Sequence, residues 1–363
     1  MPNLITIFIP TYNRLNLLQR AVTSVLNQRI PVTLHILDNA SNDGTQHYLR
    51  KLQESYSNIH LTLRQTNLGS FTNFQEGFNS VKTKYLIPLA DDDELVDGFL
   101  AKALEIAEQD PSLAAVIFFT EVRRHNKKVD EYTKPSGLLG KQNPKDHIKQ
   151  FLQQGHYVSW SSILWRSSTI KDIDIEKVFK EFGPASDVWF QFANFSRYPV
   201  YITNDPGSVF HMHGNQTTAT LSLNPILLSQ IGKVINNVNQ TLITGKLFSE
   251  QDTDILMRGY SLWWNKDLCS KPIHSKITPE LLFEMLTIYL NDFYPFAGFV
   301  GCPLTPLFSE LSKSVSNFTH QSAEKSSFIR KLIKQFIPPI LLTVFRRLRE
   351  MLLPHVALAF TKY

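Results

Sequence analysis

The sequence lacks several features that would assign it to a common class at once. Only two of its 363 residues, Cys269 and Cys302, are cysteines, so there is no disulfide framework and no metal-ligand spacing. The net charge of +5 is too small to indicate a nucleic-acid partner. No uncharged apolar stretch approaches the roughly 20 residues that span a bilayer. The N-terminus lacks a small-residue cleavage site and predicts a strand rather than a secretory leader.

The common nucleotide-binding motifs are missing as well. No G-x-G-x-x-G follows the first predicted strand, which disfavours a standard dinucleotide fold. There is no G-x-x-x-x-G-K-[ST], which excludes a P-loop enzyme. We find no internal repeat and no low-complexity segment. The apolar content of 43% is nevertheless ample for a packed core, in one large domain or two ordinary ones.

Alternating apolar runs and helical patterns occupy the first part of the chain. About five β-α units follow one another within roughly 120 residues, and crossovers of that length join parallel strands. The pattern predicts an α/β fold with a doubly wound, mostly parallel, Rossmann-like sheet flanked by helices. We expect its strands at residues 4–9, where Pro10 would end the strand, and at 32–37, 59–64, 84–90 and 113–119.

The rest of the chain is less regular. The pattern loosens over 120–156, and strand character resumes at 157–165 and 199–203. Beyond Leu223 we expect helices at about 224–242, 252–269, 279–291 and 305–315. This change of character predicts a catalytic domain over 1–220, a helical region over 221–325 and a basic amphipathic segment over 326–363.

An acidic cluster follows the fourth predicted strand. The apolar run Tyr85 to Ala90 stops at Asp91, Asp92 and Asp93, with Glu94 next. In open α/β sheets, ligands bind at the carboxyl ends of the strands. Aspartates there suit a hard divalent cation held against a diphosphate. The alternative is a polar loop in which one aspartate caps the next helix.

Polar residues also end the first two strands. Thr11 and Tyr12 follow the first strand, and Asp38 to Asp43 follow the second. Because parallel strands end at one edge, we expect these residues and the acidic cluster to meet in one crevice. Asp43 has a competing role as a helix cap, whereas Asp38 is harder to explain structurally, because aspartate is a poor strand residue.

Four motifs in order carry a resemblance to a known family. IPTYNR (9–14), DNASNDGT (38–45), NLG (67–69) and ADDDEL (90–95) resemble the successive motifs of family 2 glycosyltransferases with the GT-A fold. The resemblance covers about residues 3–220. It implies an inverting transfer of a sugar from a nucleotide diphosphate donor, assisted by Mn²⁺ or Mg²⁺, to a glycan or lipid-linked acceptor in surface polysaccharide biosynthesis.

The resemblance also implies roles for single residues at the donor site. The D-x-D motif would be Asp91 and Asp93, with Asp93 and Asp91 on the metal, while Asp92 would turn away or cap the next helix. The family often has a further acid at the position of Ala90, which is a departure here. The residues implied to contact the nucleotide sugar are Thr11, Tyr12, Arg14, Asp38, Asp43, Asn67, Gly69, Asp91 and Asp92.

The catalytic base is implied further along the chain. GPASDVWF (183–190) resembles the family's helix start, and Asp187 would be the base that accepts the proton of the acceptor hydroxyl. Ser186 stands where the family often has Glu, and the alternative role of either residue is a helix cap. In HMHGNQT, His213 fits the family's metal or diphosphate ligand, with His211 as the other candidate.

Trp160 and Ser161 lie where the family builds its acceptor platform, although a glycine is more usual there. An aromatic ring could stack on a sugar. The alternative is a tryptophan packed in the core.

The C-terminal residues 326–353 alternate apolar and basic side chains around Pro338 and Pro339. Such a segment suits the surface of an anionic membrane, and packing on the catalytic domain or a dimer contact is the alternative. We therefore expect a cytoplasmic protein, peripheral on the inner face of the cell membrane, without a nucleic-acid partner.

Two other functions compete with a glycosyltransferase. One is a glycosyltransferase-like subunit that binds nucleotide without turnover, which the departure at Ser186 keeps open. The other is a nucleotidyltransferase, which shares the sheet and the metal. A nucleotidyltransferase usually has a glycine-rich basic loop after the first strand, and residues 11–14 contain no glycine.

Overall fold

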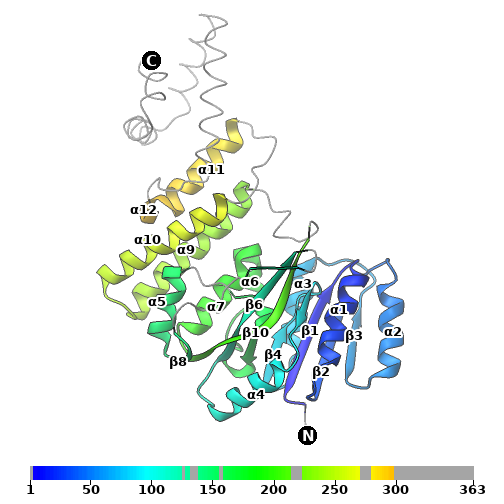
Figure 1. Cartoon of the computed structure of the whole chain (residues 1–363). Helices are drawn as coiled ribbons and strands as arrows, with labels where there is room; N and C mark the ends of the chain where they lie inside the picture. The colour runs from blue at the N-terminus through cyan, green and yellow to red at the C-terminus, as the bar shows by residue number, and fades with distance from the viewer. Residues whose placement is uncertain are drawn as a thin grey trace, which may run out of the picture. The chain divides into compact units, whose positions relative to one another are not determined.

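The computed structural model describes residues 3–124, 127–130, 138–154, 158–213, 223–269 and 279–297. The predicted helix at 305–315 and the basic segment at 326–353 lie outside these residues. All the described residues belong to one compact unit of the chain, which is built on a single sheet with the strand order β3-β2-β1-β4-β9-β6-β10-β5 (Figure 1). The mixed α/β architecture agrees with the predicted fold class.

One half of the sheet is parallel, as predicted. Its strands pair β3 with β2, β2 with β1, and β1 with β4, all in parallel. Each is followed along the chain by a helix or, after β4, by the acidic cluster. The strands are β1 (Ile5–Thr11), β2 (Val32–Asp38), β3 (Ile59–Leu63) and β4 (Tyr85–Pro88), and the helices are α1 (Leu15–Leu26), α2 (Thr45–Ser55) and α3 (Ser70–Ser80).

Strand β1 does not end at Pro10, contrary to our expectation. It continues to Thr11, which lies opposite Asp38 of β2. The last residue pair between β1 and β4 is Phe8 with Pro88. Alternate residues of a strand face opposite neighbours, so Pro10 faces the β4 side beyond the end of that ladder, where its missing N–H breaks no hydrogen bond.

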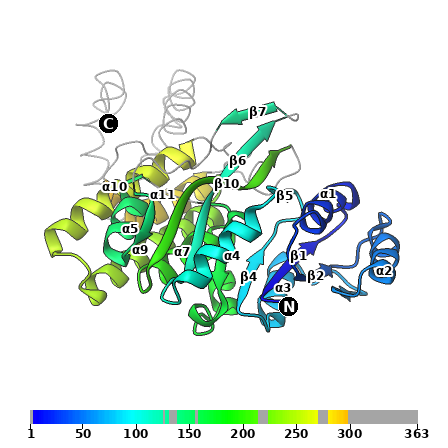
Figure 2. The same ribbon diagram turned by 60° about the horizontal axis from the view of Figure 1, so that its bottom comes forward.

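The other half of the sheet is mixed. Strand β9 runs antiparallel to both β4 and β6, and β10 runs parallel to β6 and antiparallel to β5. Figure 2 shows β6, β7 and the end of β10 extending past the sheet beside β5. These strands are β5 (Asp93–Leu95), β6 (Ala115–Arg124), β7 (Lys127–Asp130), β8 (Gly140–Gln142), β9 (Ile163–Arg166) and β10 (Val200–Met212).

Helices cover both faces of the sheet. Ile5, Ile7 and Ile9 of β1 pack in one buried cluster with residues of α1, α2 and α4. Phe8 points to the opposite face and contacts Phe74 and Phe78 of α3 edge-on. The remaining helices and 3-10 turns described before β10 are α4 (Phe99–Gln109), α5 (Pro144–Gln154), α6 (Ile175–Phe182), α7 (Ser186–Phe195), η1 (Trp160–Ser162), η2 (Ser167–Thr169) and η3 (Gly183–Ala185).

Four helices follow β10 in the described part of the chain. Helix α9 contacts α6, α7 and η3, and α10 contacts α5 (Figure 1). No described helix is long and apolar enough to span a membrane. The helices are α9 (Pro225–Gly245), α10 (Glu250–Cys269), α11 (Pro279–Asp292) and α12 (Tyr294–Ala297).

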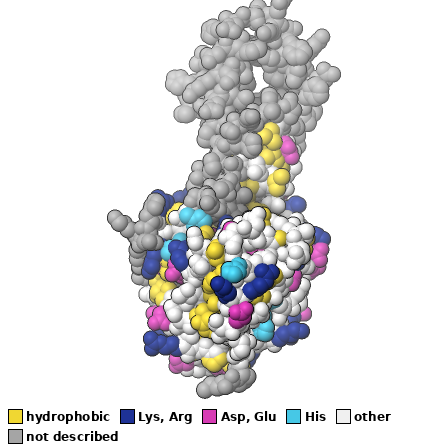
Figure 3. Space-filling view, turned by 90° about the vertical axis from the view of Figure 1, so that its right-hand side faces the viewer, with side chains coloured by type: hydrophobic (Ala, Val, Ile, Leu, Met, Phe, Trp, Pro, Cys, Tyr) yellow, Lys and Arg dark blue, Asp and Glu magenta, His cyan; other side chains and the backbone are white. Residues whose placement is uncertain are grey.

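On the face of the molecule near α2, Lys and Arg side chains lie among Asp and Glu (Figure 3).

Candidate active site

The ends of β1, β2 and β4 meet at one edge of the sheet, as predicted. Thr11 lies beside Asp38 in the β1–β2 register, and its hydroxyl donates a hydrogen bond of 2.8 Å to Oδ2 of Asp91, which follows β4. Thr11 is buried. The last residue of one strand therefore holds the first carboxylate of the acidic cluster.

Arg14, just before α1, joins two of the aspartates. Its Nη1 lies 3.0 Å from Oδ1 of Asp91 and 3.3 Å from Oδ2 of Asp92. Burial by itself would lower the pKa of Arg14, but the two carboxylates outweigh it and raise that pKa. Arg14 thus stays charged between two carboxylates and neutralises part of the cluster.

Asp93 occupies a different environment. Its Oδ2 accepts hydrogen bonds from the hydroxyls of Ser159 (3.1 Å) and Ser161 (2.7 Å). Its Oδ1 is buried and has no hydrogen-bond partner among the described residues. Burial, and then the charge of Asp92, raise the pKa of Asp93 to about 8. The same two causes raise the pKa of Asp91 to about 6, against the opposing effect of Arg14.

The prediction that Asp92 turns away or caps the next helix is wrong. Oδ2 of Asp92 accepts from Arg14 and lies 3.2 Å from Nε2 of His213. Helix α4 has Gly98 as its N-cap, with a left-handed backbone conformation, and no side chain caps the helix. The three aspartates diverge: Asp91 and Asp92 contact Arg14, Asp92 also contacts His213, and Asp93 contacts the two serines.

Asp38 and Asn39 form a second polar group at the end of β2. Asp38 is fully buried; its Oδ2 accepts from the Ser41 N–H (3.0 Å) and from Gln46 Nε2 (2.8 Å), while Oδ1 has no hydrogen-bond partner among the described residues. Nδ2 of Asn39 donates to Oδ1 of Asn67 (2.7 Å) and to the carbonyl of Gly69 (3.1 Å). The predicted residues Asn67 and Gly69 are therefore tied to the strand end through Asn39, which sequence reasoning did not single out.

Asp43 has the structural role that we weighed against nucleotide binding. Its carboxylate accepts from the N–H of Leu15 (2.9 Å) and from both the N–H (3.1 Å) and the hydroxyl (2.6 Å) of Thr45. Burial by itself would raise the pKa of Asp43, but these hydrogen bonds together outweigh burial and lower that pKa. Asp43 thus ties the start of α1 to the start of α2. Tyr12 is 43% exposed at the same edge.

Asp187 lies in the first turn of α7. Its Oδ1 accepts from the N–H of Val188 (2.8 Å). Gln191, one turn further on, donates to the carbonyl of Val158 (2.9 Å), next to the serines that hold Asp93. Ser186 is buried, and its hydroxyl donates to the carbonyl of Gly183 (2.6 Å). The residue that departs from the family pattern therefore stabilises the turn before the helix.

Trp160 packs in an aromatic cluster. Its ring stacks on Phe179 and Phe190, with centroids 6.4 Å and 5.7 Å away and interplanar angles of 1° and 10°. The residue is half-buried and is not part of the fully buried core. Its neighbour Ser161 binds Asp93, so the turn η1 connects the aromatic cluster to the acidic one.

The acidic cluster suits a cation bound partly by substrate. No three His, Cys, Asp or Glu side chains in the described part of the chain converge as a ready metal site. Mg²⁺ typically uses one or two carboxylates and completes its shell with waters and substrate phosphates. The unpartnered Oδ1 of Asp93 offers such an oxygen in a site where a positive charge would relieve the proximity of Asp92.

Comparison with known proteins assigns the domain. The model of glycosyl transferase family 2 matches residues 6–172, which include the strand ends, the acidic cluster and η1. Residues 6–172 belong to glycosyl transferase family 2. This agrees with the resemblance that the four sequence motifs carry.

Two curated relatives match part of this glycosyltransferase domain. The GalNAc(5)-diNAcBac-PP-undecaprenol beta-1,3-glucosyltransferase of Campylobacter jejuni is 31% identical over 111 residues, which are 30% of this chain and 36% of that protein. The putative teichuronic acid biosynthesis glycosyltransferase TuaG of Bacillus subtilis is 28% identical over 103 residues, 28% of this chain and 41% of that protein. The matches thus span well under half of either relative.

A solved structure matches much more of the fold. The crystal structure of S. aureus TarS 1–349 in complex with UDP-GlcNAc has a TM-score of 0.61 and covers 80% of this chain and 81% of that one. At 13% sequence identity the match shows the fold alone. It confirms the expected GT-A type of sheet.

Proposed function

We propose that this chain is an inverting glycosyltransferase that moves a sugar from a nucleoside diphosphate donor to a hydroxyl of a glycan or lipid-linked acceptor. The observation that carries the proposal is the hydrogen-bonded group of Thr11, Arg14, Asp91 and Asp92 at the strand ends of a family 2 domain. The names of the two curated relatives, one acting on an undecaprenol-linked glycan and one in teichuronic acid biosynthesis, support surface polysaccharide assembly as the setting.

Donor binding follows from the charges and free acceptors at this edge. The buried Oδ1 of Asp38 can accept an N–H of the base, and the exposed ring of Tyr12 can cover it. Arg14 and His213 lie on either side of Asp92 and can face the diphosphate. A divalent cation held by Asp93, with Asp91 nearby, would neutralise negative charge on the leaving nucleoside diphosphate.

Asp187 is the proposed general base. It takes the proton of the acceptor hydroxyl as that oxygen forms a bond to C1 of the sugar. The bond from C1 to the phosphate oxygen breaks on the opposite face, so the configuration at C1 inverts. The nucleoside diphosphate leaves with the bonding electrons, and the proton stays on the carboxylate until solvent removes it.

The test is a donor screen with the full chain. Incubation with UDP-, GDP- and CDP-sugars and Mn²⁺ should release one nucleoside diphosphate, and transfer to an added acceptor should give the inverted anomer by NMR. Product with retained configuration would contradict the mechanism.

The second candidate is a subunit that binds nucleotide without turnover. The observation behind it is Ser186, whose hydroxyl is bonded to the backbone and replaces a carboxylate common in the family. Tight binding of a nucleoside diphosphate, with no turnover by the parent protein across the donor panel and a range of acceptors, would favour this candidate.

A further inference from the structure

Two neighbouring rows of side chains connect the N-terminal half of α1 and the residue before it, the acidic segment, and the end of β10 with the residue after it. The first row is Arg14, Asp92 and His213 at the active site. The second row is Arg20, Glu94 and His211, with Arg20 Nε 3.6 Å and His211 Nε2 2.6 Å from Oε1 of Glu94. Each row joins an arginine, a carboxylate and a histidine. Glu94 lies two residues after Asp92, and His211 lies two residues before His213.

The backbone ladder between β5 and β10 ends near these rows, whereas β10 stays paired with β6 on its other side up to Met212. Strand β5 has three residues, and its last pair with β10 toward the active site is Asp93 with Phe210. His211 and His213 lie beyond that pair. Beyond that pair, side-chain contacts of His211 with Glu94 and of His213 with Asp92 link this side of β10 to the acidic segment.

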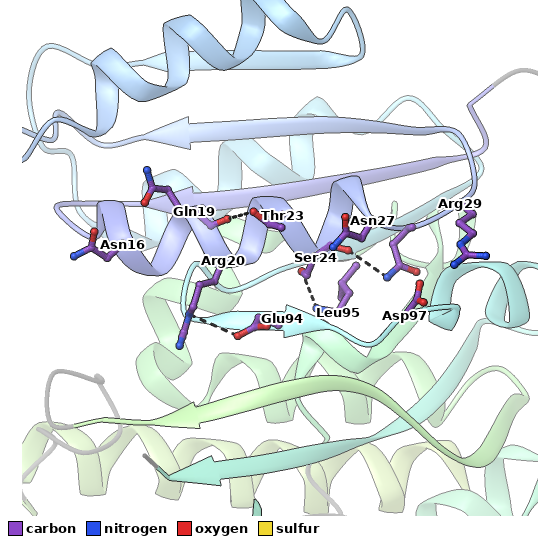
Figure 4. Close-up of a pocket in the computed structure, with 11 residues that line it drawn as sticks. Asn16, Gln19, Arg20, Thr23, Ser24, Asn27, Arg29, Glu94, Leu95 and Asp97 are labelled. Carbon is purple, nitrogen blue, oxygen red and sulfur yellow. Dashed lines mark hydrogen bonds and ion pairs between the residues drawn. The ribbon is translucent and has the colours of Figure 1, made fainter. Parts of the chain in front are cut away.

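Helix α1 holds the other edge of β5, which is the last strand of the sheet. Three side chains in α1 or just after it, spaced at i, i+4 and i+8, bond the backbone of residues 92–96. Arg20 Nη2 donates to the carbonyl of Asp92 (3.4 Å) and Gln28 Nε2 donates to the carbonyl of Val96 (2.9 Å). Ser24 Oγ accepts from the N–H of Leu95 (2.9 Å). Figure 4 shows Arg20 pointing toward Glu94 and Ser24 toward Leu95 of β5. These residues line a pocket of about 680 Å³. These bonds satisfy an edge that would otherwise lack partners.

We propose that Arg20, Glu94 and His211 are positioning residues that fix the end of β10, and thereby His213, against Asp92. The proposal rests on the proposed function, because it concerns the donor end of that site. Arg20 bonds the backbone of Asp92 and approaches Glu94, so one side chain links the two rows. Glu94 then holds His211, two residues before His213.

A simple stabilising ion pair would not have this effect. Arg20 and Glu94 side chains are 37% and 29% exposed, and pairs at the surface contribute about 0–1 kcal/mol to stability. Arg20, Glu94 and His211 should therefore act mainly on the geometry of the end of β10. Loss of their contacts should weaken donor binding more than it lowers the melting temperature.

The experiment compares the full-length parent with Glu94→Gln, Glu94→Asp and Lys102→Gln. Lys102 also forms an ion pair with β10, 2.6 Å from Asp205, at a more exposed position. Two readouts are taken: hydrogen exchange of the amides of residues 208–213, and the Kd of UDP with Mn²⁺. Couplings between contacting residues of 0.5–3 kcal/mol predict a weakening of UDP binding by about twofold to 100-fold in Glu94→Gln.

We expect Glu94→Gln to show faster exchange and weaker UDP binding, Glu94→Asp to restore part of both, and Lys102→Gln to match the parent. Unchanged exchange, or faster exchange with parental UDP affinity, would overturn the positioning role. If the parent bound no UDP, UDP would be refuted as the donor nucleotide. In that case, exchange at the parental rate in Glu94→Gln would separately refute the positioning role of Arg20, Glu94 and His211.

Discussion

The parallel and mixed halves of the sheet build the site in different ways. In the parallel half, β3-β2-β1-β4, each polar group lies at the end of its own strand, as Thr11 and Asp38 do. In the mixed half, β9-β6-β10-β5, each contact joins distant parts of the chain, as those of Asp93 with Ser161 and Asp92 with His213 do. Local sequence therefore places the polar groups at the strand ends of the parallel half, whereas in the mixed half contacts between distant segments complete the proposed site.

The largest effect should come from the mixed half. Asp187→Asn removes the proposed base but keeps the shape of the side chain, so transfer should fall by about 10²–10⁴-fold. Nucleotide binding should stay near the parental value, because Asp187 makes none of the proposed donor contacts. Asp146→Asn, in the first turn of α5, is the matched control. Transfer at the parental rate by Asp187→Asn would remove Asp187 as the base.

Asp93→Asn tests the point where the two halves meet. It removes a buried carboxyl that has one unpartnered oxygen and whose ionisation burial opposes, so the protein without cation should melt at a higher temperature. The same change should weaken Mn²⁺-dependent nucleotide binding by about tenfold or more, because a neutral amide is a poorer cation ligand. Calorimetry and thermal melts measure both, and parental Mn²⁺ dependence in the variant would sink the assignment.

Gly77→Ala probes the packing of the parallel half. A Cβ at Gly77 would lie 2.3 Å from Cδ2 of Phe8, and such overpacking costs about 1–3 kcal/mol. Gly259→Ala in α10, where a Cβ meets nothing within 4 Å, should instead stabilise the helix by about 0.5–1 kcal/mol. Urea unfolding compares the two, and equal shifts would contradict the packing described at Phe8.

The remaining prediction is a dependence of stability on pH. The pKa values of Asp91 and Asp93 are raised to about 6 and about 8, so the folded state holds protons that the unfolded chain releases near pH 4. Their contribution makes the cation-free protein lose stability as pH rises from about 4 to about 8, with no further loss above. In thermal melts, Asp93→Asn should lose less stability than the parent between pH 6 and 8.

The sequence predicted the parallel half well because its signals are local. The first three strands begin and end within two residues of the predicted bounds, and the short crossovers correctly predicted parallel strands that end at one edge. Pro10 misled the prediction because whether a proline ends a strand depends on how far the neighbouring strand extends.

The mixed half was harder to predict because its structure depends on distant partners. Helices α5 and α6 were missed, and the direction of β9 depends on pairing with both β4 and β6. Asp92 was assigned away from the site because spacing alone gives no information about Arg14 and His213. Asn39 lay inside a quoted motif, and its position directly after Asp38 was the signal that could have identified it.

The most direct test of the account is a calorimetric titration of UDP into the full chain, with Mn²⁺ and with EDTA, for the parent and Asp93→Asn. We predict binding to the parent that is strong with Mn²⁺ and weak with EDTA, and weak binding to Asp93→Asn in both. GDP and CDP titrated in the same way identify the base if UDP does not bind. Failure of all three nucleotides to bind, or equal binding by parent and variant, would contradict a cation-assisted nucleoside diphosphate site at this edge.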